Sequence, residues 1–120
     1  MLVSTLLVLT LMGDGSTRVT LSEHESPDHC EAARESVVAI LTEAGMAPLA
    51  ARCGETALRL TPFEHGMPAE AEVHRYRVDM PAAGGFAVAP LGPDTPCTPQ
   101  PGAEPVVICA RSGQEVLADG

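Results

Sequence analysis

The chain has 120 residues, the usual size of one domain, so we predict a single domain over residues 1–120. Only 2% of the residues are aromatic against 45% hydrophobic, which predicts an aliphatic core of Leu, Val, Ala and Met. The net charge of −9 opposes phosphate binding, and the seven basic residues are scattered along the sequence without forming a patch. We therefore expect no nucleic-acid partner.

The apolar run Met1–Met12 supports two interpretations. It is too short for a transmembrane span, which takes roughly twenty apolar residues. It suits the apolar part of a secretory signal cleaved near Gly13–Gly15, although no Lys or Arg precedes Arg18. The alternative is a β-hairpin, because Gly13–Ser16 is a typical turn between two strand-like runs. We prefer the hairpin; the missing basic leader favours a cytoplasmic protein, whereas a signal would make it periplasmic.

A helix follows the hairpin. Ser26 can cap its first amides, Pro27 suits the first helical position, and Asp28 complements the positive end of the helix dipole. Gly45 marks its end. Apolar residues recur between these points at helical spacing, which predicts an amphipathic helix with a narrow apolar stripe: Cys30, Ala33, Val37, Ile40, Leu41 and Ala44.

The second half of the chain is predicted to form strands and one long loop. Residues 56–61 and 73–80 alternate like half-buried strands, with Arg75 and Arg77 of the second facing water. A break at 66–68 separates them. Six prolines between 90 and 105 predict an extended loop, because proline lacks the amide that sheets and helices use. A last strand spans 106–110, and residues 114–117 add a weak one.

These elements predict an α+β fold. An N-terminal hairpin and one amphipathic helix pack on a small antiparallel sheet, with a core at 2–80 and the proline-rich loop 90–105 before the last strand 106–110.

The four cysteines are candidates for disulfide bonds. Order along the chain pairs Cys30 with Cys53 and Cys97 with Cys109, although three connectivities are possible. Each bridge would add about 2 to 4 kcal/mol by limiting the unfolded chain. The alternative is four reduced cysteines acting as small buried hydrophobic residues in a cytoplasmic protein.

The histidines and cysteines also contain the types of side chain that bind zinc. Their spacing matches no C-x-x-C, H-x-x-x-H or H-E-x-x-H motif, and His29 and Cys30 point about 100° apart on a helix. We therefore predict no metal, no cofactor and no catalytic residue from the full set of candidates: His24, His29, Cys30, Cys53, His65 and His74.

Two segments carry a loose resemblance. The run Leu7–Leu11 passes through a Gly-Asp-Gly turn into Val19–Leu21, and Cys30-Glu31-Ala32-Ala33 precedes a later Cys53. In this the chain resembles short bacterial proteins of unknown activity that have an N-terminal hairpin, a Cys-Glu-Ala-Ala helix and a second Cys. The resemblance covers about the first half, and it implies a β-β-α-β core beginning almost at Met1.

No pattern in the sequence converges on a reaction, so we expect a small non-enzymatic accessory or protein-interaction protein. Its partner would be another protein, docked on an unpaired edge of the hairpin. One alternative is an exported, disulfide-stapled periplasmic or envelope binding protein. A second alternative is a small metal-binding protein or enzyme.

Overall fold

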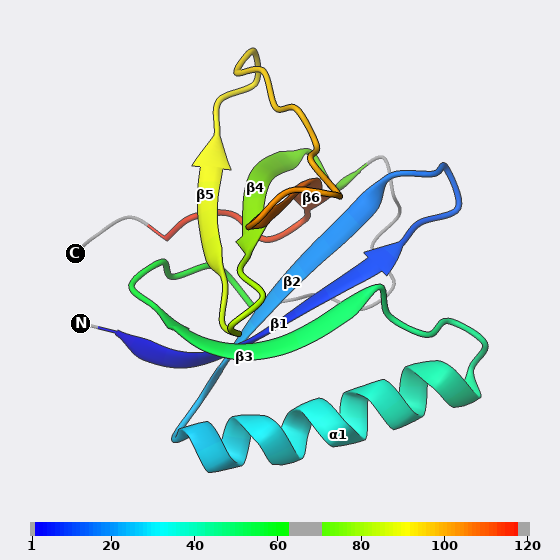
Figure 1. Ribbon diagram of the computed structural model, residues 1–120, viewed down its shortest axis with the longest axis vertical. Helices are drawn as coiled ribbons and strands as arrows, with labels where there is room; N and C mark the ends of the chain where they lie inside the picture. Colours follow the sequence, from blue (N-terminus) through cyan, green and yellow to red (C-terminus); the bar gives the residue numbers. More distant parts are fainter. Residues whose placement is uncertain (1, 63–70, 118–120) are drawn as a thin grey trace.

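The computed structural model describes residues 2–62 and 71–117. These ranges contain one helix and a curled six-stranded sheet, so the predicted α+β class is confirmed (Figure 1). The strand order is β3-β1-β2-β6-β4-β5. The elements are β1 Val3–Leu11, β2 Thr17–His24, α1 Pro27–Glu43, β3 Ala50–Thr56, β4 His74–Met80, β5 Ala87–Leu91 and β6 Val106–Ser112.

The predicted hairpin is formed by β1 and β2, which pair antiparallel from Ser4 opposite His24 to Leu11 opposite Thr17. Gly15 adopts a φ of 88° in the connecting turn, a conformation that favours glycine. Because β3 pairs along the other side of β1, the apolar N-terminal run is an interior strand of the sheet. Removing it as a signal would leave β3 without the strand that it pairs with.

The helix α1 has the predicted bounds, but the predicted apolar stripe is only partly buried: Cys30, Ala33, Val37 and Leu41 pack on the sheet, whereas Ile40 and Ala44 are exposed. Ser26 is the N-cap and accepts a hydrogen bond from the His29 amide at 3.1 Å, Pro27 begins the helix, and Gly45 follows its C-cap with a φ of 77°. Within the described part of the chain, no helix has the length and apolar character that crossing a bilayer requires.

The expectation of a purely antiparallel sheet is wrong at one junction. β2 and β6 run parallel, with Arg18 opposite Arg111, while the other pairings are antiparallel. A parallel neighbour needs a long crossover. The chain between β2 and β6 supplies one, because it contains α1 and three further strands.

The strand predicted at 56–61 is also wrong, since β3 ends at Thr56. In the 58–61 segment Leu60 makes an isolated bridge to Val116, and the Thr61 amide donates to the Glu115 carbonyl. β3 itself, with the sequence AARCGET, contains few residues that favour strands. Its pairing along β1 overrides that local preference.

The last strands partly match their predictions. β4 at His74–Met80 confirms the strand expected at 73–80, and β6 extends two residues beyond the predicted 106–110. β5 was not predicted; it includes Pro90, which an edge strand tolerates because its N–H side is unpaired. The break expected at 66–68 lies outside the described residues.

The sheet buries its concave face, and α1 covers part of the opposite face. Figure 1 shows α1 beneath β1 and β3, on the side away from β4, β5 and β6. Between helix and sheet lies a small cluster around Leu6, Val8 and Cys30. The curled sheet encloses the larger cluster on its concave face: Leu7, Leu9, Val19, Leu21, Leu60, Tyr76, Val78, Met80 and Ala110.

The curl brings the two edge strands together. Arg52 on β3 donates through Nη1 to the carbonyls of Pro81 and Gly85 in the β4–β5 turn, at 2.6 and 3.1 Å. A Cβ at Gly54 would lie 2.9 Å from the Phe86 ring, so a larger residue there would displace that ring.

Candidate functional site

The four cysteines lie in the two pairs that sequence order suggested. Cys30 and Cys53, and Cys97 and Cys109, are each at disulfide-bonding distance with Cα atoms 6.1 Å apart. The first pair joins α1 to β3, and the second holds the proline-rich loop against β6. Both pairs connect elements of the fold, and none of the four cysteines is left unpaired.

The histidine candidates divide into two places. His24 and His29 meet at the helix start, with their Nδ1 atoms 3.3 Å apart. Partial burial lowers the pKa of His24, and the charge of the neighbouring His29 lowers it further. His74 is on β4, away from that pair, and its Nε2 atom lies 3.9 Å from the Glu115 carboxylate. His65 lies outside the described residues. Among the described residues, no three His, Cys, Asp or Glu side chains are grouped to hold a metal ion.

Three arginines align across the outer face of the sheet, which sequence reasoning did not foresee. Arg111 on β6 is directly opposite Arg18 on β2 and Arg75 on β4. Directly opposed residues project from the same face of a sheet. The basic residues are therefore not all scattered; Arg18, Arg111 and Arg75 form an arginine row in a chain of net charge −9.

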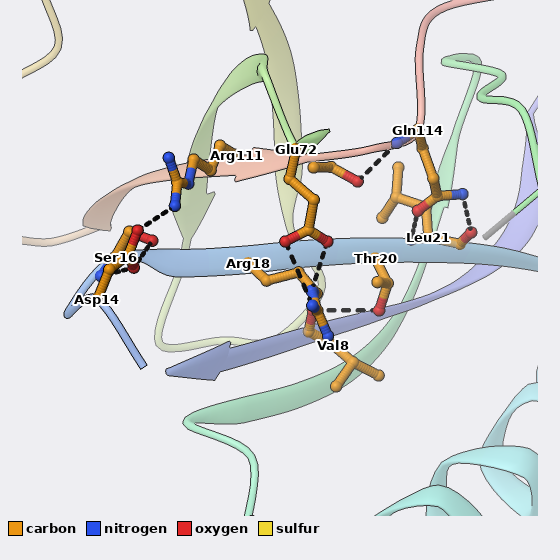
Figure 2. A network of polar contacts seen from close by, with 10 residues as sticks. Val8, Asp14, Ser16, Arg18, Thr20, Leu21, Glu72, Arg111 and Gln114 are labelled. Carbon is orange, nitrogen blue, oxygen red and sulfur yellow. Dashed lines mark hydrogen bonds and ion pairs between the residues drawn. The ribbon is translucent and has the colours of Figure 1, made fainter. Parts of the chain in front are cut away.

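Buried Glu72 neutralises the first arginine of the row. Its carboxylate is fully buried and accepts two hydrogen bonds from Arg18, from Nε at 2.6 Å and from Nη2 at 3.2 Å (Figure 2). A bidentate pair of this kind is stronger than neutral hydrogen bonds. It fastens the segment before β4 to the hairpin.

The second arginine has an exposed carboxylate partner. Arg111 pairs through Nη2 with Asp14 in the hairpin turn, and their side chains are 30% and 49% exposed. Hydrogen bonds from Ser16, assisted by the charge of Arg111, lower the pKa of Asp14 below its ordinary value. The Arg111 Nε is buried and has no hydrogen-bond partner among the described residues. Its donors are therefore only partly used.

The third arginine donates to neutral groups. Arg75 Nη1 donates to the carbonyl oxygens of Gly92 and Pro93 at 2.9 and 3.2 Å. Arg75 and Arg111 line an open groove of about 650 Å³, which we call the arginine groove. Its other walls come from the hairpin turn, the proline-rich loop, β6 and one leucine before β3: Gly15, Ser16, Thr17, Leu49, Pro99, Pro101, Val107, Ile108, Cys109 and Ala110.

A second groove, of about 700 Å³, lies between the end of the hairpin and the C-terminal end of α1. We call it the hairpin-end groove. Leu11, Met46 and Leu49 on its walls are 64%, 60% and 55% exposed. Leu49 belongs to both grooves, so the two are adjacent. The remaining lining residues are Thr10, Met12, Gly13, Arg18, Leu41, Gly45 and Ala47.

Gln114 joins β2 to the end of the chain. Its side-chain amide is buried, donates to the Leu21 and Thr61 carbonyls at 3.0 and 2.6 Å, and accepts from the Leu21 amide at 3.0 Å. Beside it, the Tyr76 hydroxyl donates to the Gln114 carbonyl at 2.6 Å. Beyond Arg18, the side chain of Gln114 makes the hydrogen bonds to the β2 backbone that a paired strand would otherwise make. Gln114 therefore has a structural role.

The hairpin edges that we expected to dock a partner are both occupied. β1 is paired with β3 on one side of the hairpin, and β2 lies beside β6 on the other. The prediction of a free hairpin edge is therefore wrong, because three further strands and β3 extend the sheet past it.

No protein-family model, curated protein or solved structure matches the chain. The resemblance to short bacterial proteins with a Cys-Glu-Ala-Ala helix therefore stays a prediction.

Proposed function

We propose that the protein is a non-enzymatic accessory domain that binds another protein through the hairpin-end groove. The observation that carries this proposal is the exposure of Leu11, Met46 and Leu49 around one hollow. Single exposed apolar residues are ordinary, whereas several around one concave surface are typical of an interaction site.

The chemistry of the groove favours an apolar segment of the partner. Among the described residues that line it, Arg18 is the only charged one, and Glu72 pairs with it. Met46 supports such a role, since a flexible thioether adapts to different apolar surfaces. The partner would therefore contribute aliphatic or aromatic side chains rather than a charged patch.

The test is a comparative capture experiment with the full chain as bait in a lysate of its native host. Met46→Glu places a charge in the groove on an exposed loop residue, so the fold is expected to persist. Val73→Glu is the matched control, because Val73 is equally exposed but lies outside the groove. The expected result is one protein recovered by the wild type and by Val73→Glu and lost with Met46→Glu.

Two results would contradict the proposal. Equal recovery by both variants would place the interaction elsewhere. Concentration-dependent self-association in analytical ultracentrifugation, abolished by Met46→Glu, would assign the groove to a second copy of this chain.

A second candidate function is an exported, disulfide-stapled binding protein of the envelope. The two cysteine pairs at bonding distance favour it, because disulfides persist in oxidising compartments. Intact-mass measurement of natively expressed protein tests it: export predicts the mass of four fewer hydrogens than the reduced chain. A fully reduced chain would reject this candidate.

A further inference from the structure

Among the described residues, one arginine of the arginine row has no carboxylate partner. Like charges directly opposite each other in a sheet are destabilising. Glu72 offsets Arg18 and Asp14 offsets Arg111, whereas Arg75 donates to carbonyl oxygens, which are neutral. Within the described part of the chain, the positive charge of Arg75 therefore faces the arginine groove without a carboxylate partner, although the overall charge of the chain is strongly negative.

The donors in this groove suit an oxyanion. A guanidinium presents planar N–H groups that match both oxygens of a carboxylate. The Asp14–Arg111 pair is partly exposed, and ion pairs that reach solvent contribute little, so a second carboxylate could compete with Asp14 at small cost. The hydroxyl-bearing residues Ser16 and Thr17 also line the groove and add polar atoms beside the arginines.

The remaining walls suit an apolar body. Pro99, Pro101 and Val107 line the groove with Leu49. The Cys97–Cys109 pair holds the proline-rich loop against β6, so these walls are in place before a ligand arrives. The volume of about 650 Å³ is in the ordinary range for sites of small molecules.

We propose that the arginine groove binds a small monocarboxylate with an apolar body, such as a medium-chain fatty acid. The carboxylate lies between Arg75 and Arg111, and the apolar body lies against the two prolines. Leu49 lines both grooves, but this site differs from the one proposed for protein binding, because it depends on Arg75 and Arg111 and the hairpin-end groove contains neither.

The experiment titrates decanoate into the full chain with both cysteine pairs oxidised, by calorimetry and by amide NMR. Decanol tests the need for the carboxylate, and inorganic phosphate tests the need for the apolar body. Arg75→Gln removes one arm of the site. Arg77→Gln is the matched control, since Arg77 lies two residues along the same face of β4, pairs with Asp79, and does not line the groove.

Decanoate is expected to shift the amides of Thr17, Cys109 and Arg111, and to bind about tenfold more weakly to Arg75→Gln, as loss of a charged hydrogen-bonding partner predicts. Arg77→Gln is expected to bind like the wild type. Arg75→Lys retains the charge without the planar fork and should bind with intermediate affinity, which keeps the test valid if Arg75→Gln does not fold.

Three outcomes would overturn the proposal. Equal affinity of decanoate for the wild type and for the Arg75 variants would show that Arg75 does not bind the carboxylate. If decanol bound as tightly as decanoate, the site would not recognise the carboxylate. If phosphate bound as tightly as decanoate, the site would not need the apolar body.

Discussion

The two halves of the sheet are covered in different ways. β3, β1 and β2 are covered by α1, and one cysteine pair joins that helix to β3. β6, β4 and β5 have no helix; the proline-rich loop lies against β6, held there by the other pair. A helix satisfies its own backbone amides and can cover a sheet by packing alone, whereas an extended proline-rich loop depends on the cross-link to stay in place.

Little backbone pairing joins the halves. β2 and β6 share one register position, Arg18 opposite Arg111, and beyond it Gln114 supplies side-chain hydrogen bonds to β2. The concave apolar cluster and the Arg18–Glu72 pair complete the junction. The halves are therefore joined mainly by side chains, and the arginine groove lies at that junction.

The largest expected effect comes from the shared cluster. Leu7 is fully buried in the cluster that contains residues of both halves. Leu7→Ala should lower the free energy of unfolding by about 4 kcal/mol and leave a single transition, because both halves lose the same contact surface. Urea denaturation followed by circular dichroism measures it. The exposed Ile40→Ala on α1 should cost less than about 0.5 kcal/mol; two separate transitions would show that the halves fold independently.

The cysteine pairs sharpen the comparison between the halves. Replacing either pair by serine should cost about 3 kcal/mol by the loop-entropy relation. The Cys30–Cys53 replacement should cost about 0.6 kcal/mol more, because its sequence separation is 23 residues against 12 for Cys97–Cys109.

Hydrogen exchange should separate these two variants. Loss of Cys97–Cys109 is expected to speed exchange in the proline-rich loop and β6 and to leave β1 protected. Uniform acceleration over the whole chain would contradict the view that this pair mainly holds the loop.

The next largest loss of stability is expected from the Arg18–Glu72 ion pair at the junction. Glu72→Gln leaves Arg18 without its bidentate carboxylate and should cost about 2 kcal/mol, less than for a fully buried pair because Arg18 is partly exposed. Chemical denaturation gives the value. Glu31→Gln, which breaks an exposed pair on α1, should cost less than about 0.5 kcal/mol. Similar costs for both would mean that Glu72 does not stabilise the junction.

Local signals predicted most of the first half of the fold. The Gly13–Ser16 turn and the Ser26 cap depend on neighbours in sequence, and both occur where expected. β3 could not be placed in the same way, because its pairing with β1 overrides the weak strand preference of its residues. Cysteine order was sufficient to suggest the pairs that the structure brings together.

These local sequence signals could not predict the candidate site. Arg18, Arg75 and Arg111 are far apart in sequence and align only through the register of three strands, one of them parallel. Glu72 carries no local pattern that indicates burial beside Arg18.

The smallest effect concerns pH and also tests the junction, because Tyr76 donates to Gln114 there. Burial, with a contribution from Glu115, raises the pKa of Tyr76 to about 12 from an ordinary 10.0. The folded state therefore favours the neutral phenol, so this contribution to stability is complete below pH 10 and is lost as the pH rises towards 12. By pH 11 the loss should be about 1 kcal/mol.

No lysine titrates in the alkaline pH range of this chain, and Tyr76 is its one tyrosine. Denaturation midpoints measured between pH 8 and 11, with phenolate absorbance as a second readout, should fall in the wild type and stay level in Tyr76→Phe. An equal fall in both would assign the alkaline loss to another group, and would leave the Tyr76 hydrogen bond at the junction without an energetic role.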